Sequence, residues 1–365
     1  MNNKEPKGKI IFITLDITLL GGIERVISVL TEQFVKDGYD VDIYSIFKVG
    51  DNPSYKFPEN VNITYLTQKK YLGKLELYYN ILRSVIKIRQ LSEGHCVIST
   101  LTNISCIYGV LNYFKYAEFI AAEHSQYNAH SFLVRLLRIL AYKKSNYVVP
   151  LTEHDVNIFS KFISTDRIKL INNPSSFKSI SISSSLASKR LVSIGRLVDV
   201  KNYSFMLQEI APFLLKNTDW CLEIYGDGEL KPVLSAYADV LGISQNVKFK
   251  GFVENVNECI AGSSFYLCSS KTEAFPMAFL EALSLGIPII SVNCPFGPRE
   301  IINDGFNGYL LDSDTIYSDF YSCLQSIKED ELIYNSLQKE AFASSKKYEV
   351  SLIASKWYEL IPFKI

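Results

Sequence analysis

The chain has 365 residues, of which 48% are hydrophobic and 21% are charged, and its formal net charge is zero. That length predicts two domains, or one large one, with ordinary cores. The balanced, scattered charge argues against a nucleic-acid-binding protein. The first 175 positions hold 21 of the 38 lysines and arginines but 16 of the 38 aspartates and glutamates. The first half is therefore basic and the second half acidic, and we expect the two halves to face different partners.

The cysteine pattern and the apolar runs indicate the compartment. Seven cysteines occur without a CxxC spacing, which indicates reduced thiols and a cytoplasmic protein. The first apolar run is short and is broken by Asp16, so it predicts a strand and not a signal peptide. Residues 96–114 lack charge but contain hydroxyl and amide side chains, which predicts a buried strand and helix, not a membrane span.

Short apolar runs alternate with helical patterns in the first half. The predicted strands cover residues 10–15, 41–47, 97–99, 118–122 and 147–150. A helix is predicted over 23–36, ended by Gly38. This alternation is typical of a parallel sheet covered by helices on both faces, and we assign it to a first domain, residues 1–175. A serine-rich stretch, 176–189, predicts a linker.

The alternation restarts after the linker. Strands are predicted at 191–194, 220–225, 247–250, 264–268 and 287–292, with helices at 202–216 and 229–241. From about Asp314 the pattern is helical to the end. The predicted fold class is α/β, with two Rossmann-like, doubly wound domains that face a cleft. The second domain covers residues 190–345, and a C-terminal helical segment covers 346–365.

Ligands of such sheets bind beyond the carboxyl ends of the strands, so the residues that follow each strand matter most. Gly21 and Gly22 precede the first helix, where free amide groups and close backbone approach suit a phosphate. Their spacing matches neither the dinucleotide fingerprint nor the P-loop, and a simple tight turn is the alternative. His124 follows the fourth strand and could donate to a substrate oxygen, with a structural histidine as the alternative.

Arg196 and Lys201 follow the first strand of the second domain. A planar guanidinium and an ammonium near a helix start can hold a diphosphate, whereas two solvated surface cations are the alternative. Further along the chain, Glu273 and Glu281 are eight residues apart, with Pro276 between them. Pro276 suits the first turn of a helix, which leaves Glu273 in the loop before it and Glu281 inside it. Two carboxylates accept hydrogen bonds well from a ligand rich in hydroxyl groups.

Metal sites are not expected. Asp40 and Asp42, like Asp312 and Asp314, have the D-x-D spacing of metal-dependent transferases. The first pair lies at the start of a predicted strand and the second lies beyond the last one, so neither suits a ligand site. The sequence also has no His/Cys cluster with metal-ligand spacing, and we expect no metal and no cofactor.

Four motifs together resemble glycosyltransferase family 4, the retaining, nucleotide-sugar-dependent enzymes of GT-B fold. They are Gly21-Gly22-Ile23-Glu24-Arg25, Gly195-Arg196-Leu197 with Lys201-Asn202, Glu273-x7-Glu281, and Gly297-Pro298-Arg299-Glu300 followed by Asp304-Gly305-Phe306-Asn307-Gly308. The resemblance covers essentially the whole chain. Ala274 departs from the pattern, because the family commonly has glycine there.

The resemblance implies a role for each matched position. Arg196 and Lys201 would hold the donor diphosphate as it leaves, Glu273 would face the donor sugar, and Glu281 would bind the ribose. The remaining implied donor contacts are Gly21 and Gly22 at the phosphates, His124 at the sugar, the backbone of Phe275, Pro276, Met277 and Ala278 at sugar or phosphate oxygens, and Phe252 and Val253 near the nucleobase. The catalytic set would be Glu273, Arg196, Lys201 and His124.

The resemblance further implies a retaining hexosyltransferase that uses a UDP-sugar. A hexose or N-acetylhexosamine would move to a glycan acceptor, linked to a lipid diphosphate, in the biosynthesis of a surface polysaccharide, lipopolysaccharide or capsule. The first domain would face the acceptor, the second would bind the donor, and the last helix would cross back to the first. A sugar-nucleotide epimerase of the same fold and a non-catalytic nucleotide-sugar-binding protein stay open as alternatives.

Two segments of the basic half bear on localisation. Residues 74–91 and 129–144 mix apolar and basic side chains at helical spacing. One interpretation is a patch that contacts the inner face of the cytoplasmic membrane and reaches a lipid-linked acceptor. The alternative is two ordinary buried helices with cationic edges.

Overall fold

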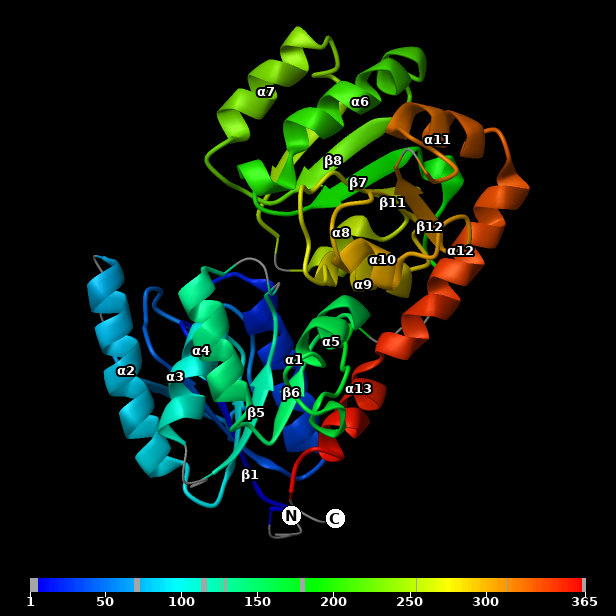
Figure 1. The fold of residues 1–365 in the computed structure, drawn as a ribbon. Coiled ribbons are helices and arrows are strands. Elements are labelled where there is room, and N and C mark those ends of the chain that lie inside the picture. The colour runs from blue at the N-terminus through cyan, green and yellow to red at the C-terminus, as the bar shows by residue number, and fades with distance from the viewer. Residues whose placement is uncertain are drawn as a thin grey trace. The chain divides into compact units, whose positions relative to one another are not determined.

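The computed structural model describes residues 6–68, 73–112, 117–125, 127, 130–177, 181–253, 255–312 and 314–362. It divides into two compact units, Met1–Ser176 with Val350–Ile365, and Phe177–Glu349. Each unit is built on a six-stranded sheet whose neighbouring strands run parallel (Figure 1). The predicted α/β class with two doubly wound sheets is confirmed.

The first sheet has the order β3-β2-β1-β4-β5-β6. Its strands are β1 Lys9–Thr14, β2 Asp40–Ser45, β3 Asn62–Tyr65, β4 Cys96–Ser99, β5 Glu118–Ala122 and β6 Tyr147–Val149. The sequence predicts all of them except β3, a short edge strand with no buried residue. The strand order reverses between β1 and β4, the place where ligands of such sheets bind.

Helices cover both faces of the first sheet. They are α1 Gly22–Lys36, α2 Lys74–Leu91, α3 Thr102–Leu111, α4 Phe132–Tyr142, α5 Glu153–Phe159 and α13 Val350–Tyr358. Helices α2, α3 and α4 lie side by side on one face, and α1 and α13 pack together on the other (Figure 1). Helix α1 buries Val26, Leu30 and Phe34 at helical spacing. It ends as predicted at Gly38, whose φ of 93° suits glycine.

The second sheet repeats this topology, in the order β12-β11-β10-β7-β8-β9. Its strands are β7 Arg190–Ile194, β8 Cys221–Tyr225, β9 Val247–Gly251, β10 Phe265–Cys268, β11 Ile289–Val292 and β12 Gly308–Leu311. Only β12 is missing from the sequence prediction. The order reverses between β7 and β10, which pair in parallel.

Seven helices are assigned in the described part of the second unit. They are α6 Tyr203–Lys216, α7 Lys231–Val240, α8 Val256–Ile260, α9 Met277–Ser284, α10 Gly297–Ile301, α11 Phe320–Ile327 and α12 Glu331–Ser345. Helices α6, α7 and α11 cover one face of the sheet, while α8 and α9 lie on the other, where α9 contacts α12 (Figure 1). Single 3-10 turns occur at Thr165–Arg167, Leu186–Ser188, Asp199–Lys201 and Lys346–Tyr348.

The segment predicted as a linker, 176–189, belongs almost entirely to the second unit. Ser184 Oγ donates a hydrogen bond to the Gly286 carbonyl at 2.6 Å, and Gln338 Nε2 donates to the Ser184 carbonyl at 2.7 Å. Residues 178–180 lie outside the described part of the chain. From residue 181 onward the segment is therefore held against the second unit by specific hydrogen bonds.

The last helix, α13, belongs to the first unit, although residues 177–349 separate it from the rest of that unit. Its Tyr358 hydroxyl donates to the Asp37 carboxylate at the end of α1. The Tyr358 ring lies 5.2 Å from the Tyr39 ring and 5.6 Å from the Phe34 ring, measured between centroids. Aromatic contacts and one charge-assisted hydrogen bond thus fix the end of the chain on α1.

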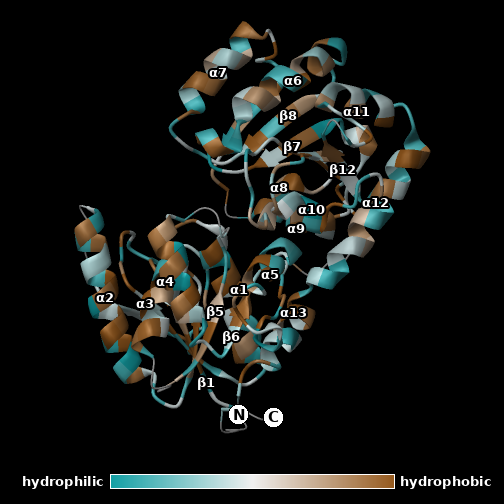
Figure 2. Ribbon diagram, viewed as in Figure 1, coloured by the Kyte–Doolittle hydropathy of each residue, from teal (hydrophilic) through white to brown (hydrophobic). Residues whose placement is uncertain are grey.

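Two helices of the first unit leave apolar side chains exposed. On α2 these are Leu75, Tyr79, Leu82 and Ile86, and on α4 they are Phe132, Leu133, Leu136, Leu137 and Leu140. Both sets recur at helical spacing and form one stripe along each helix, and Figure 2 shows hydrophobic segments along both. None of the described helices is both long enough and apolar enough to cross a bilayer.

Candidate functional site

The strand ends at the reversal point of the second sheet carry the first group of predicted site residues. Strand β7 is followed by Gly195 and Arg196, and β10 is followed by the loop that carries Glu273. Because β7 and β10 are parallel neighbours, their carboxyl ends meet at one edge of the sheet. The fold therefore brings together two segments that lie far apart in the sequence.

A direct ion pair joins the two segments. Lys201 Nζ donates to Glu273 Oε1 at 2.6 Å, and the Ser270 hydroxyl donates to the same oxygen at 2.6 Å. The side chains of Lys201 and Glu273 are 25% and 13% exposed, so the pair is partly sheltered from water. Burial alone would lower the pKa of Lys201, but the Glu273 carboxylate raises it above its ordinary value. Lys201 is thus a positive charge at neutral pH.

The backbone around Lys201 is held as firmly as its side chain. Lys201 closes the 3-10 turn Asp199–Lys201, and the next residue, Asn202, adopts a left-handed conformation with φ 53°. The Ser269 hydroxyl donates to the Lys201 carbonyl at 2.9 Å. Both the main chain and the side chain of Lys201 are therefore tied to the residues that follow β10.

A glycine is needed at position 195 because the Lys201 side chain lies over it and leaves little room for another side chain. A Cβ on Gly195 would lie 3.2 Å from Lys201 Cε and 3.0 Å from the Tyr203 hydroxyl. The turn after β8 approaches the same segment even more closely. A Cβ on Gly226 would lie 2.0 Å from the Gly195 carbonyl oxygen, and one on Gly228 would lie 2.4 Å from that of Leu197. Gly226 and Gly228 therefore let the turn after β8 pack directly against this strand end.

The Glu273 loop is supported from α10. The Gly297 amide donates to the Glu273 carbonyl at 2.9 Å, and a Cβ on Gly297 would lie only 2.7 Å from the Ala274 carbonyl oxygen. The start of the Gly297 motif thus positions the loop. Ala274, the departure from the family pattern, leaves these contacts intact.

Helix α9 begins one residue later than predicted. Pro276 is its N-cap, outside the first turn, and Met277 is the first helical residue. Glu281 lies inside the helix and is only 1% exposed, whereas Glu273 lies in the preceding loop. Phe275 is buried against Tyr348, with 5.8 Å between ring centroids. The loop position of Glu273 and the helical position of Glu281 agree with the sequence prediction, and the amide groups of Met277 and Ala278 mark the open end of the helix.

The turn after β9 joins the same edge of the sheet. Gly251 has φ 76°, and its carbonyl accepts a hydrogen bond of 2.7 Å from the Gly226 amide. The next residue, Phe252, is 52% exposed, and Val253 is half-buried. An exposed aromatic ring beside a glycine turn offers a flat face for a planar ring.

In the first unit, the carboxylate of Glu24 lies against the Gly21-Gly22 turn. Gly21 caps α1, and a Cβ there would lie 2.3 Å from Glu24 Oε2, so the Glu24 side chain folds back over the turn. Glu24 is 7% exposed, and burial raises its pKa to about 7, with a contribution from Asp16. An ionised carboxylate here repels an anion, so the turn suits a phosphate less well than the glycines alone predict.

His124 lies at the carboxyl end of β5. Burial lowers its pKa to about 4, which leaves a neutral imidazole at pH 7. The ring lines a small, mostly apolar cavity with Leu30 of α1, Trp357 of α13 and Asn173. The Asn173 Oδ1 atom is buried there without a hydrogen-bond partner among the described residues. A neutral His124 can donate one hydrogen bond and accept another.

Comparison with known proteins decides the family. A family model described as glycosyl transferases group 1 matches residues 178–343. An uncharacterized glycosyltransferase of Haemophilus influenzae is 28% identical over 354 residues, which cover 96% of this chain and 98% of that protein. An alpha-1,4-N-acetyl-D-galactosaminyltransferase of Campylobacter jejuni is 30% identical over 351 residues, which cover 93% of this chain and 95% of that protein. The chain belongs to the group 1 glycosyltransferases.

The fold of this glycosyltransferase agrees with the assignment. A structure of HepE from Anabaena superimposes with a TM-score of 0.74 at 16% identity, covering 96% of this chain and 98% of that one. The GT-B fold that the motifs predict is therefore confirmed, as is the family resemblance.

The predicted residues of this glycosyltransferase fall into two groups. The second unit brings Lys201 and Glu273 into contact, and places Arg196, exposed to solvent, at the same strand end. Gly21, Gly22 and His124 belong to the first unit. Sequence reasoning missed Ser270, which holds Glu273, and gave no role to Glu24. The Ser-x-x-Glu spacing was the available signal for Ser270, but spacing alone does not reveal which carboxylate oxygen it contacts.

Proposed function

We propose that this glycosyltransferase moves a hexose or N-acetylhexosamine from a UDP-sugar to a glycan acceptor, with retention of anomeric configuration. The contact between Lys201 and Glu273 at the reversal point of the second sheet carries this proposal. It pairs a cation suited to a diphosphate with a carboxylate suited to sugar hydroxyls. The HepE structure holds UDP and glucose, which supports UDP as the nucleotide.

The chemistry follows from the charge that develops during transfer. The bond between the sugar C1 and the diphosphate oxygen breaks, and the acceptor hydroxyl forms its bond to C1 on the same face. The acceptor proton passes to the leaving phosphate. Negative charge grows on that phosphate, and Lys201 with Arg196 stabilises it. Two hydrogen bonds already engage Glu273 Oε1, which favours an orienting role for this carboxylate over covalent attack.

The remaining donor contacts follow the elements around this pair. Glu281 in α9 would bind the ribose hydroxyls, and the amide groups of Met277 and Ala278 would bind sugar or phosphate oxygens. Phe252, exposed on the turn after β9, would stack on the nucleobase. From the first unit, Gly21 and Gly22 would approach the phosphates and His124 the sugar. No metal takes part in this scheme, because the cations named above supply the positive charge.

We also propose a lipid-linked acceptor, at the inner face of the cytoplasmic membrane. The exposed apolar stripes on α2 and α4 support this, because they end beside basic side chains: Arg83 and Lys87 on α2, and Lys143 and Lys144 after α4. The Campylobacter relative is named for an acceptor carried on undecaprenol diphosphate. Biosynthesis of a surface polysaccharide, lipopolysaccharide or capsule is the corresponding process.

Vesicle flotation tests the membrane contact. The protein should float with vesicles that contain anionic lipid at low salt and stay at the bottom with neutral vesicles. Leu133→Glu with Leu136→Glu on α4 should abolish flotation. Leu332→Glu, which alters an even more exposed leucine of the second unit, should not. If the unaltered protein binds no anionic vesicles at low salt, the membrane contact is wrong.

A panel of nucleotide sugars with lipid-diphosphate-linked glycans tests the function itself. We expect one UDP-sugar to yield UDP and a product heavier by one sugar, and only when an acceptor is present. UDP release without any acceptor, with an epimerised sugar, would favour the epimerase. Binding of a UDP-sugar without turnover under all conditions would favour the non-catalytic alternative.

A further inference from the structure

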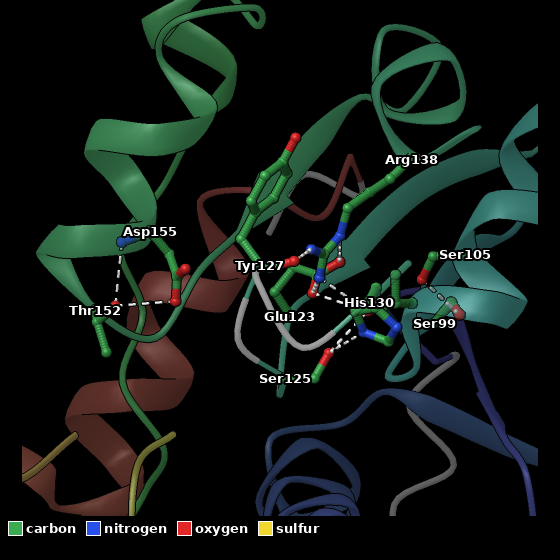
Figure 3. A network of polar contacts seen from close by, with 10 residues as sticks. Ser99, Ser105, Glu123, Ser125, Tyr127, His130, Arg138, Thr152 and Asp155 are labelled. Carbon is green, nitrogen blue, oxygen red and sulfur yellow. Dashed lines mark hydrogen bonds and ion pairs between the residues drawn. The ribbon is translucent and has the colours of Figure 1, made fainter. Parts of the chain in front are cut away.

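A buried network of polar side chains surrounds the segment that carries His124. Arg138 of α4 is 0% exposed, and its guanidinium contacts both oxygens of Glu123, with Nε 3.2 Å from Oε1 and Nη2 in contact with Oε2 (Figure 3). Arg138 Nη2 also donates to the Thr102 hydroxyl at 2.9 Å. The arginine therefore joins α4, α3 and the end of β5.

The network holds the segment after β5 at several positions. Glu123 is bound by Arg138, and the Thr102 hydroxyl lies 2.9 Å from the Ser125 hydroxyl. Ser125 Oγ lies in turn 2.9 Å from His130 Nε2, and the Arg138 guanidinium lies 5.3 Å from the centroid of the Tyr127 ring (Figure 3). Residues 126, 128 and 129 lie outside the described part of the chain.

His124 lies between two of these anchors but faces the other side of the sheet. Glu123 contacts residues of α3 and α4, whereas His124 lines the cavity beside Leu30 of α1 and Trp357 of α13. The Glu123 amide donates to the Val149 carbonyl at 2.9 Å, which continues the pairing of β5 beyond Ala122. Successive side chains of a strand point to opposite faces, so fixing Glu123 also sets the direction of His124. Among the described residues no hydrogen bond of the His124 imidazole is found, so its orientation depends on the backbone and on the side chains that line the cavity.

The energetics of the pair favour an orienting role. Arg138 and Glu123 are 0% and 3% exposed, and burying two charges costs much of what their attraction returns. Apolar residues of similar volume often give equal or greater stability in such places. A planar guanidinium fixes the direction of the carboxylate that it binds, whereas an apolar side chain does not.

We propose that Arg138 and Glu123 act as positioning residues for His124, setting the direction from which its imidazole meets the donor sugar. This inference rests on the proposed function, in which His124 contacts that sugar. It assigns the network to the sugar-transfer step and not to the stability of the first unit.

A double-mutant cycle on the full-length protein tests the proposal. Arg138→Met with Glu123→Leu replaces the pair by apolar side chains, and the change is made both in the unaltered protein and in a His124→Ala background. We expect kcat to fall roughly tenfold in the unaltered background and by less than about twofold with His124→Ala, because coupled residues are not additive. Thermal unfolding monitors the fold of every variant.

Three results would overturn the proposal: equal losses of kcat in both backgrounds, unchanged kcat in the unaltered background, or wild-type kcat for His124→Ala alone. If the double replacement does not fold, kcat of Thr102→Val is measured in the same two backgrounds. It removes the hydroxyl between Arg138 and Ser125 at nearly constant volume. Absence of sugar transfer by the unaltered protein would instead contradict the proposed function, so the two failures are distinguishable.

Discussion

Lys201 and Glu273 are 72 positions apart in the sequence, yet Lys201 Nζ lies 2.6 Å from Glu273 Oε1. Neighbouring parallel strands bring them together, and Ser270 donates to the same carboxylate oxygen. In the proposed complex the donor diphosphate would share Lys201 with Glu273, and the second oxygen of Glu273 would meet the sugar. The free protein thus holds both groups in place before the donor arrives.

Removing either cation at this strand end should slow the transfer. We expect Arg196→Ala and Lys201→Ala each to lower kcat by roughly 10²–10³, the scale for losing one preorganised stabiliser of developing charge. Steady-state rates of nucleotide release, with the best donor and acceptor, provide the measurement. Near-normal turnover in both variants would show that these cations do not stabilise the leaving diphosphate.

Ser270→Ala should impair transfer through Glu273. The variant leaves Glu273 Oε1 with Lys201 as its remaining described donor, so the carboxylate gains freedom and kcat should fall about tenfold. Ser184→Ala is a matched control, because Ser184 is also a buried serine of the second unit with a hydrogen bond of 2.6 Å. Equal effects of the two changes would mean that Ser270 contributes stability only.

Gly195→Ala should displace the Lys201 side chain. The added Cβ would lie 3.2 Å from Lys201 Cε and 3.0 Å from the Tyr203 hydroxyl, tighter than ordinary contact. We expect the KM for the donor to rise severalfold. A shift of about 1 Å in a positioning group can lower the reaction rate by a far larger factor. Gly73→Ala, where an added Cβ meets nothing within 4 Å, should leave the kinetics unchanged. An unaltered KM for Gly195→Ala would contradict the close packing.

Glu24 should make stability depend on pH. Burial raises its pKa from 4.5 to about 7, so the folded protein binds this proton more tightly than the unfolded chain does. The contribution of Glu24 to folding stability is therefore lost as pH rises from about 4.5 to 7, by up to about 3 kcal/mol. Glu24→Gln should gain stability relative to the unaltered protein at pH 8 but little at pH 4.5. Urea unfolding at both values checks this, and a parallel pH response of the two proteins would refute it.

Most of the fold could be predicted because the apolar runs and helical patterns alternate so regularly. The two strands that were not predicted, β3 and β12, lack a clear apolar run for physical reasons. Strand β3 is a short edge strand with alternating half-buried and exposed residues, and β12 begins with Gly308, whose absent Cβ allows close packing on the Ile289 carbonyl. Edge position and close backbone approach are properties of the assembled sheet, so the sequence pattern does not display them.

The candidate site was less predictable than the fold. The motifs singled out Arg196, Lys201, Glu273 and Glu281, because their residue types and spacing are distinctive. The contact between Ser270 and Glu273 and the position of Glu24 over Gly21 depend on side-chain directions and burial. Those quantities arise only when distant segments pack, and no local pattern of residues encodes them.

Calorimetric titration of UDP and of the preferred UDP-sugar tests the central claim, that Lys201 and Glu273 form the donor site. Lys201→Ala should weaken UDP binding roughly 10–100-fold, the scale of a charged hydrogen bond. Glu273→Gln should leave UDP binding undiminished and weaken binding of the UDP-sugar, because its contact is with the sugar. If Lys201→Ala binds UDP as tightly as the unaltered protein does, Lys201 is not part of the donor site. If Glu273→Gln binds the UDP-sugar as tightly as the unaltered protein does, Glu273 does not contact the sugar.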